Sequence, residues 1–424
     1  MAEYTADGYY EPSEIPEEAA PETEPTAEEP EKPKAPPAPK VAQARKKINF
    51  RFITADIDKP FCILVLALLV FGIVMMFSAS YAYALSEHGD GYYFVTKQIK
   101  SAVLGLVMMF LVSFLDYHFF QTTFVAYGIF VLTVGLTFIT TFIGSTTADA
   151  TRWLDLGFIQ LQPSELMKVG FIIIFAFIMA VNFPYFKKWQ FSILPFAVIM
   201  ALVIGVLFLQ RHMSAVMLIA IIGLTMMYVS GMPKKHFFIF VGAAALLGGL
   251  AILYKVFVAK DFGYITDRIQ SWRDPLSDPT DKTLQTYNSL IAIGSGGIFG
   301  LGFGESRQKY LYLPESQNDF VFSVVCEELG LVGALTVILL FVMFILRGFY
   351  IASHAKDRFG MLIATGITIQ IGAQALLNIA VATNAFPNTG ISLPFFSYGG
   401  TALVIQLAEM GILLSISRQS HTRK

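Results

Sequence analysis

The sequence is short of charge and of cysteine, and each shortage excludes a class of protein. Charged side chains make up 14% of the 424 residues, whereas an ordinary soluble chain is about one-quarter charged, which argues against a water-soluble globular enzyme. The two cysteines, Cys62 and Cys326, lie in apolar stretches, so we expect neither a disulfide framework nor a cysteine-based metal site. The six histidines lack metal-site spacing, and no concentrated basic region indicates nucleic-acid binding.

The charge that is present is unevenly distributed. Residues 1–48 hold 11 acidic and 6 basic residues, a local net charge of −5, and the remainder carries +4. This first segment is rich in Glu, Pro and Ala, and it lacks the basic start and apolar core of a secretory signal. We therefore expect residues 1–48 to form a disordered cytoplasmic tail, and we favour a spacer over a partner-recruiting segment.

Long apolar runs dominate the rest of the chain, which is 55% hydrophobic overall. A helix that crosses a bilayer needs about 20 mostly apolar residues. The runs of roughly this length are 60–84, 97–115, 122–144, 164–182, 190–209, 214–230, 237–258, 318–346, 360–382 and 398–417. Because lipid cannot satisfy open strand edges, and these runs lack the alternation of a membrane barrel, we expect an all-α polytopic membrane protein with about ten transmembrane helices.

Short basic loops predict how these helices are oriented. The loops that carry the bases are 187–188, 234–235, 347–358 and 418–424, on the same side as Arg45–Lys47. The positive-inside rule then places both termini in the cytoplasm, with a membrane domain at 49–418 and a short C-terminal tail at 419–424. The large loop between helices 7 and 8, residues 259–317, falls outside, and its mixed composition favours function over disorder.

Charge beside a membrane span is costly, so each instance is a functional candidate. Glu165 and Lys168 are three residues apart, which predicts a pair on one helix face; the alternative is a local pair that only fixes the helix end. Asp319 lies where the eighth span begins, and Asn318 or Gln317 would cap that helix. The helix dipole favours a carboxylate in the first turn, so an ordinary first-turn acid is the alternative for Asp319.

Basic residues of the outer loops suit phosphate oxygens. Arg268 and Lys309, with two further arginines of the same loop, make a lipid phosphate or pyrophosphate ligand plausible, although an exposed arginine is normally just solvated. Arg152 and Trp153, outside the third span, pair a cation with an interfacial ring. A membrane anchor is the alternative for that tryptophan.

Two further features are assigned structural roles. Glu327 and Glu328 are adjacent carboxylates deeper in the eighth span, where they must face protein, water or a base, and we expect structural pairing. The glycine-rich stretch 294–304 permits tight turns, but no Gly-Lys-Ser/Thr follows a strand there. It is therefore not a Walker-type loop, and ATP use is unsupported.

Several segments stand in a distinctive order along the chain. They are Arg152–Asp155, Gln162–Glu165 with Lys168, Asp274–Pro275, Ile291–Gly297, Gln308–Lys309, Leu313–Glu315, Asn318–Phe320, Glu327–Gly330 and Gly390–Gly400. In this order and spacing they resemble the shape, elongation, division and sporulation (SEDS) family, the bacterial FtsW/RodA/SpoVE proteins, over about residues 58–418. The resemblance implies a ten-helix peptidoglycan glycosyltransferase that polymerises lipid II at the outer face of the cytoplasmic membrane.

The resemblance also implies roles for individual residues. The family's essential aspartate corresponds to Asp319, its lysine to Lys168 and its tryptophan to Trp153. Gln285 keeps a family position, whereas Gln210–Ala215 departs from the family's Gln-Pro-Asp-x-Gly-Thr, so any role of that acid does not carry over. The remaining candidates for substrate contact are Arg152, Glu165, Arg268, Lys309, Glu315 and Ser397.

The resemblance and the residues together suggest a mechanism and partners. We expect Asp319 to act as general base on the 4-hydroxyl of the acceptor GlcNAc, with Lys168 holding Asp319 ionised. The sequence specifies no cofactor. Assistance by a divalent cation, Mg²⁺ or Mn²⁺, at the pyrophosphate is left open. The expected partners are lipid II, a class B penicillin-binding protein, other division or elongation proteins and membrane lipids.

Two other functions stay open at this point. A lipid II flippase would also need many helices and buried charge, but it would not need one irreplaceable outer carboxylate. A structural scaffold for the division machinery would need no chemistry at all. The long N-terminal tail favours the division branch of the family. Membership of that branch would place the protein at the division septum.

Overall fold

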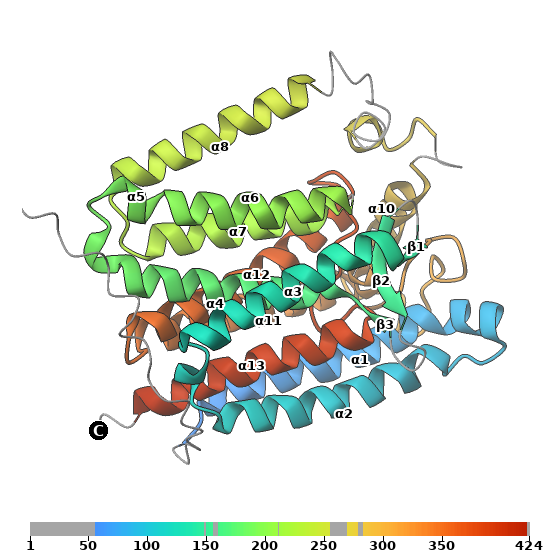
Figure 1. Ribbon diagram of the computed structural model, residues 1–424. Helices are drawn as coiled ribbons and strands as arrows, with labels where there is room; N and C mark the ends of the chain where they lie inside the picture. Colours follow the sequence, from blue (N-terminus) through green and yellow to red (C-terminus); the bar gives the residue numbers. More distant parts are fainter. Residues whose placement is uncertain are drawn as a thin grey trace, which may run out of the picture. The chain divides into compact units, whose positions relative to one another are not determined.

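The structure is a computed structural model that describes residues 56–147, 150–155, 160–210, 212–254, 269–278 and 283–421. Its helices are α1 (Lys59–His88), α2 (Tyr93–Phe114), η2 (Tyr117–Phe119), α3 (Thr123–Ile143), α4 (Pro163–Asn182), η3 (Phe183–Tyr185), α5 (Trp189–Ser192), α6 (Leu194–Leu209), α7 (Met213–Val229), α8 (Lys234–Tyr254), α10 (Leu284–Ser295), α11 (Val321–Ser353), α12 (Arg358–Ala382) and α13 (Gly400–His421) (Figure 1).

The predicted fold class, an all-α polytopic membrane protein, is confirmed. Eight of the described helices have the length and hydropathy of membrane spans, and α7 is a shorter apolar helix. The count of ten spans and their orientation stay predictions. The predicted tail at 1–48 lies outside the described residues, and α13 continues to His421, three residues past the predicted end of the membrane domain.

Local sequence explains where the helices start and stop. Asp58 caps α1 by accepting a hydrogen bond from the Phe61 amide at 2.9 Å, and Gly89 ends the helix in the left-handed conformation. Asp357 caps α12 in the same way, through the Gly360 amide at 3.0 Å. Asp58 also forms an ion pair with Arg347 of α11, Oδ2 to Nη2 2.7 Å, so the cap joins two helices.

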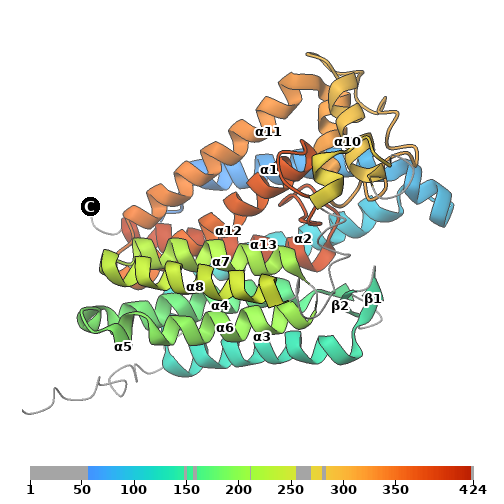
Figure 2. The same ribbon diagram turned by 90° about the horizontal axis from the view of Figure 1, so that it is seen from above.

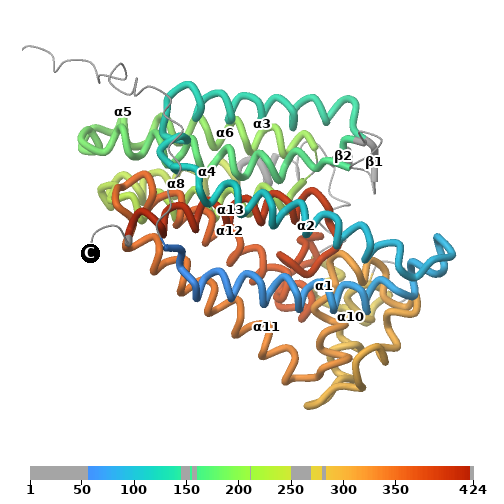
Figure 3. The backbone as a smooth tube through the Cα atoms, turned by 90° about the horizontal axis from the view of Figure 1, so that it is seen from below, coloured from blue at the N-terminus to red at the C-terminus, as the bar shows by residue number. Residues whose placement is uncertain are grey.

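The bundle is built around three helices, α4, α12 and α13, which bury more of their spans than the others. Here α2 packs along α13, α3 along α4, and α11 against both α12 and α1. Figures 1 and 3 show α1, α2 and α13 side by side, with α8 at the edge of the bundle against α7. The buried face of α12 contacts two of the functional candidates described below, Lys168 and the backbone of Asp319.

Small elements gather at one end of the bundle. A three-stranded antiparallel sheet joins β1 (Ser145–Thr147), β2 (Ala150–Asp155) and β3 (Gln160–Leu161), and sequence analysis did not anticipate it. Figure 2 shows α10 at the same end, beside the start of α11. This end receives the loops that the positive-inside rule assigns to the outside.

Helix α11 is broken at Gly330, whose backbone has φ +64°. Segment 296–302 fills the break: Leu301 and Gly302 donate to the carbonyls of Glu327 and Glu328, and the Leu331 amide donates to Gly297. A break would otherwise leave buried backbone groups without partners. The loop and the helix therefore complete each other's hydrogen bonds.

Candidate active site

Asp319 lies in a series of turns, residues 313–320, which we call the Asp319 turn. The amides of Asn318 and Asp319 both donate to the Glu315 carbonyl, at 3.0 and 3.1 Å, and Asn318 Nδ2 donates to Glu315 Oε2 at 2.5 Å. Glu315 itself adopts a left-handed backbone, φ +56°. Such strain is costly for a residue with a side chain and concentrates at functional sites.

The cap predicted for this helix is not found. Helix α11 begins at Val321 after an N-cap at Phe320 that makes no side-chain capping bond, so neither Asn318 nor Gln317 caps it, and Asp319 precedes the first turn. The reason is the Glu315 carbonyl, which draws the amides of Asn318 and Asp319 into a turn. Asp319 remains at the N-terminal end of α11, where a negative charge is favoured.

Two other segments, α12 and loop 383–399, hold the Asp319 turn in place. Asn378 of α12 donates from Nδ2 to the Asp319 carbonyl and to the Ile391 carbonyl, both at 2.7 Å. Ser397 donates its hydroxyl to the Asn318 carbonyl, and it also accepts the Leu393 amide at 2.7 Å. Ser397, which sequence analysis proposed as a substrate contact, is thus buried and positions the turn.

The Asp319 carboxylate lies against Gly390. A Cβ added to Gly390 would stand 3.3 Å from Asp319 Oδ2, and Gly390 has φ +66°. Glycine is therefore favoured here twice, because L side chains rarely adopt this backbone conformation and because a Cβ would press on the carboxylate. The loop 383–399 thus borders the carboxylate as well as holding the backbone around it.

Lys168 and Glu165 form the predicted pair, with Nζ to Oε2 2.8 Å, and both side chains are buried. Lys168 Nζ also donates to Gln374 Oε1 at 3.1 Å. Neither partner is Asp319, so the expected direct contact between Lys168 and Asp319 is not found. The connection runs through α12, where Gln374 and Asn378 lie one turn apart and Gln374 Nε2 binds the Ser392 carbonyl at 3.1 Å.

Sequence analysis missed this row of amides on α12. Gln370, Gln374 and Asn378 are spaced by four residues, so they lie on one helix face. Gln370 Nε2 donates to both carboxylate oxygens of the buried Glu409, at 2.8 and 3.0 Å. The available signal was the i, i+4 spacing of polar side chains within an otherwise apolar span, where buried amides are costly.

Lys309 is not a ligand for pyrophosphate in this arrangement, which corrects its predicted role. Its side chain is buried, and Nζ binds Glu328 Oε1 at 2.8 Å, the Gly304 carbonyl at 2.6 Å and Ser78 Oγ at 3.1 Å. An ammonium has three donors, and all three are used within the protein. The structural pairing expected for Glu328 is thereby confirmed.

Glu327 confirms the same expectation. Its carboxylate accepts hydrogen bonds from the Ser306 hydroxyl at 2.5 Å and from the amides of Arg307 and Gln308 at 3.0 and 3.3 Å. Together with Glu328, it ties the outer loop to the first half of α11. The part of α11 that precedes the break at Gly330 is therefore held at its start by the contacts of the Asp319 turn and near its end by those of Glu327 and Glu328.

The other candidates are placed apart from this core. Trp153 is half-buried on β2 and pairs with Ser145 of β1, and the backbone of Arg152 belongs to the same strand. Gln285 of α10 accepts from Asn388 Nδ2 at 2.8 Å, which joins α10 to the loop 383–399. Arg268 lies outside the described residues.

The described residues contain no group of three or more His, Cys, Asp or Glu side chains that could hold a metal ion. Sequence analysis left such a cation open, and it stays a prediction.

The fold and this site define a polytopic membrane protein with an aspartate, Asp319, at one end of its helix bundle. Hydrogen bonds from α12 and from loop 383–399 hold the backbone around this aspartate. The family model for the FtsW/RodA/SpoVE cell cycle proteins matches residues 59–422. The chain belongs to this family, as the sequence motifs predicted.

Curated relatives and solved structures agree with this membership. A probable peptidoglycan glycosyltransferase FtsW of Geobacter sp. (strain M18) is 36% identical over 82% of this chain and 93% of its own length. Stage V sporulation protein E of Bacillus subtilis (strain 168) is 32% identical over 86% and 97%.

Two solved structures share the fold over 86% of this chain and 98% of theirs. One, described as the structural coordination of polymerization and crosslinking by a peptidoglycan synthase complex, has a TM-score of 0.70 at 26% identity. The other, the Thermus thermophilus rod shape determining protein RodA, has a TM-score of 0.63 at 25% identity. The expected multi-pass architecture is thus that of experimentally determined relatives.

Proposed function

We infer that this protein is a peptidoglycan glycosyltransferase that polymerises lipid II into glycan strands at the outer face of the cytoplasmic membrane. Family membership supports the reaction, and one structural observation supports the site. That observation is the Asp319 turn, in which contacts from α12 and from loop 383–399 fix a carboxylate-bearing backbone at the N-terminal end of α11. Such fixing is what a catalytic carboxylate needs, because small displacements cost rate.

In the proposed reaction Asp319 takes the proton of the acceptor sugar's 4-hydroxyl. The hydroxyl oxygen attacks the anomeric carbon of the donor sugar, the bond to the lipid pyrophosphate breaks, and the diphosphate leaves. A positioned base contributes about 10²–10⁴ in rate. Positive charge near the leaving diphosphate would stabilise the transition state.

Fewer basic residues are proposed to bind the diphosphate than the sequence alone suggested. This proposal leaves Lys309 out, because its buried ammonium is bound to Glu328 and Ser78. Arg268 and Arg152 stay proposed ligands, and Trp153 and Gln285 stay proposed contacts for the rest of the substrate. Lys168 and Glu165 act at a distance in this proposal, by holding Gln374 and hence loop 383–399 in register.

The proposed partners follow from the reaction. New strands need crosslinking, so a class B penicillin-binding protein is the expected partner, with other division or elongation proteins around it. We place the complex in the bacterial cytoplasmic membrane and, for the division branch of the family, at the septum.

The deciding experiment supplies lipid II to the purified protein together with its crosslinking partner and measures glycan polymer. The Asp319→Asn variant should lose at least about 10² in rate, because an amide cannot accept the proton. The matched control is Glu305→Gln, an exposed carboxylate of the outer loop, which should polymerise like the parent. An active Asp319→Asn variant would remove Asp319 from the mechanism, and a parent that moves lipid II across vesicles without polymerising it would establish the flippase.

A further inference from the structure

The connection between α1 and α2 reaches past the other helices at the end of the bundle that holds α10 and the small sheet (Figures 1 and 3). With 30 residues, α1 is about 45 Å long, whereas the hydrocarbon core of a bilayer is about 30 Å thick. The last turns of α1 therefore stand in water or among headgroups. Residues 77–94, which we call the aromatic hairpin, occupy this position.

Aromatic rings cover the hairpin in two groups. In the first, Tyr92 stacks on Phe77 at 5.6 Å between ring centroids and meets Tyr81 edge-on at 6.2 Å. In the second, Phe94 contacts Tyr83 at 5.9 Å and Tyr93 at 5.1 Å. These contacts between rings hold the side chains in position without a ligand.

Several of these rings remain open to the surroundings. Tyr92 is 58% exposed and Tyr81 is 37% exposed, and both have a polar hydroxyl on an apolar ring. Glu87 and Asp90 are exposed next to them, which is a polar setting rather than a lipid-facing one. An exposed, pre-ordered tyrosine surface in a polar setting is suited to a ligand with both apolar C–H faces and hydroxyls.

The aromatic hairpin is continuous with the Asp319 turn. Ser316 donates its hydroxyl to the Ala79 carbonyl of α1 at 3.1 Å, and the Tyr398 amide donates to the Gln317 carbonyl at 2.9 Å. The Tyr398 ring then meets Phe94 at 4.8 Å. The rings of Tyr398 and Phe94 thus connect the hairpin to Gln317, two residues before Asp319.

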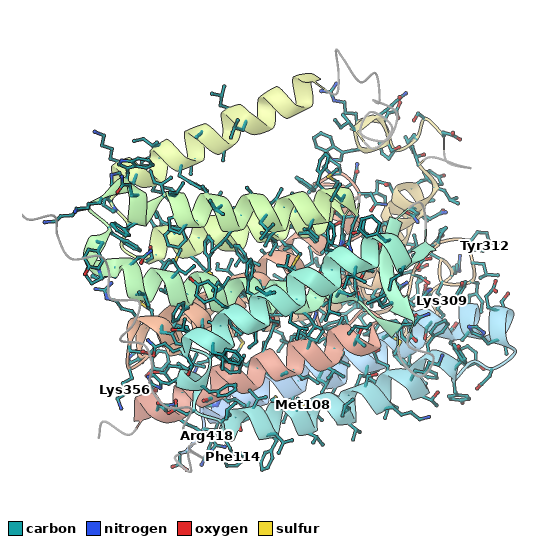
Figure 4. The ribbon with its side chains drawn as sticks, viewed as in Figure 1. Met108, Phe114, Lys309, Tyr312, Lys356 and Arg418 are labelled. Carbon is teal, nitrogen blue, oxygen red and sulfur yellow. The ribbon has the colours of Figure 1, made fainter. Side chains whose placement is uncertain are left out.

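Exposed rings also lie on the segment next to the hairpin. Lys309 binds Ser78 of α1 at 3.1 Å, which holds the following segment beside the hairpin. Tyr310 and Tyr312 of that segment are exposed, and Figure 4 shows Lys309 and Tyr312 at the hairpin end of the molecule. The exposed tyrosines of this segment therefore lie at the same end of the molecule as the aromatic hairpin.

We propose that the aromatic hairpin is a binding site for a β-1,4-linked N-acetylhexosamine chain and holds the glycan strand outside the Asp319 site. This assignment rests on the proposed function for the identity of the chain, but binding itself requires no catalysis. Sugar rings present flat C–H faces that pack on aromatic rings, and their hydroxyls and amides bind tyrosine hydroxyls. The site takes the polymer, whereas the Asp319 turn acts on the bond being formed.

The first test measures binding of a soluble β-1,4-linked N-acetylglucosamine tetramer to the purified full-length protein by calorimetry. The double variant Tyr81→Leu with Tyr92→Leu keeps apolar bulk but loses the flat rings, and it should bind about tenfold more weakly. The variant Tyr92→Phe keeps its ring and loses only the hydroxyl, so it should bind more weakly than the parent but more tightly than the double variant. Tyr228→Leu is the matched control, because Tyr228 is an equally exposed tyrosine (62%) at the end of α7, and it should change nothing.

A second test follows strand length during lipid II polymerisation. The Tyr81, Tyr92 double variant should make shorter strands while the initial rate of lipid II consumption stays within about twofold of the parent, because the reacting groups are untouched. Undetectable tetramer binding by the parent, or binding that the double variant retains, overturns the proposal. Retained sugar binding with loss of partition into vesicles in the double variant would instead assign the hairpin to the membrane interface. A parent that binds the tetramer but never polymerises lipid II would refute the proposed function and leave the hairpin site standing.

Discussion

At the scale of single residues, two buried lysines show how far sequence reasoning extends. Lys168 has a partner three residues away, Glu165, so helix geometry alone predicted their pair. Lys309 has partners 19 and 231 residues away, Glu328 and Ser78, and no local pattern encodes such contacts. We therefore predicted a substrate contact for Lys309, whereas in the structure its buried ammonium binds Glu328 and Ser78.

Gly390 gives the sharpest prediction at this scale. The variant Gly390→Ala places a methyl group 3.3 Å from Asp319 Oδ2 and strains a backbone at φ +66°, so the carboxylate must shift by a few tenths of an ångström. We expect the kcat of lipid II polymerisation to fall about 10–100-fold with little change in KM, because the displaced group acts in the chemical step.

The control separates strain from displacement. Gly89 has nearly the same φ, +68°, but a Cβ there meets nothing within 4 Å. Gly89→Ala should therefore retain the parent's kcat even if it lowers the unfolding temperature. Equal losses of kcat in both variants would mean that backbone strain, and not contact with Asp319, limits the reaction.

At the scale of elements, the sequence located the spans but not their interruptions. The predicted span 164–182 became α4, Pro163–Asn182, and 360–382 became α12, Arg358–Ala382, because long apolar runs have one solution in lipid. The break of α11 at Gly330 was not predicted. It depends on segment 296–302 supplying backbone hydrogen bonds, and hydropathy contains no information about such a partner.

The break should be as important as the span. In Gly330→Ala the new Cβ would overlap the Ile298 carbonyl and the Gly300 amide nitrogen, at a backbone of φ +64°. With ψ −160° the backbone of Gly330 lies in a region that is essentially restricted to glycine, which costs about 1–3 kcal/mol for a residue with a Cβ, and the overlap adds to it. We expect a lower unfolding temperature in a thermal melt of the purified protein, together with reduced polymerisation.

Gly294 of α10 offers the matched comparison for Gly330. An added Cβ at Gly294 meets nothing within 4 Å, and alanine is the better helix former. Gly294→Ala should leave the unfolding temperature unchanged or raise it. If Gly330→Ala unfolds at the same temperature as the parent, segment 296–302 must be able to move away from the new side chain. In that case segment 296–302 does not hold the break in place.

At the scale of the whole molecule, charged groups fix both ends of the bundle. At the Asp319 end Lys309 pairs with Glu328, and a second charged cluster lies at the opposite end, where Figure 4 shows Lys356 and Arg418. There Asp116 binds the His118 ring at 2.7 Å and Gln419 Nε2 at 2.8 Å, and His118 Nε2 lies 3.5 Å from Asp357. This cluster joins the α2–α3 connection to the start of α12 and the end of α13.

The charge of this cluster makes the stability of the protein depend on pH. Burial by itself would lower the pKa of His118, but hydrogen bonds to Asp116 and Asp357 and their negative charge outweigh it and raise the pKa to about 9. Burial would likewise raise the pKa of Asp116, yet its hydrogen bonds from His118 and Gln419 hold that pKa at about 2. His118 is therefore an imidazolium at neutral pH.

The sign of the pH effect follows from the raised pKa of His118. A group whose pKa is higher in the folded state stabilises fully below its ordinary pKa of 6.5 and loses that contribution as the pH rises through about 9. We expect the unfolding temperature of the purified protein to fall by a few degrees between neutral pH and pH values above 9. His118→Gln should start lower at neutral pH and lose less over the same interval, because it has no proton to release. The comparison of the two slopes isolates His118 from other groups that titrate in this range, and parallel slopes would show that the cluster does not hold this end of the bundle together through charge.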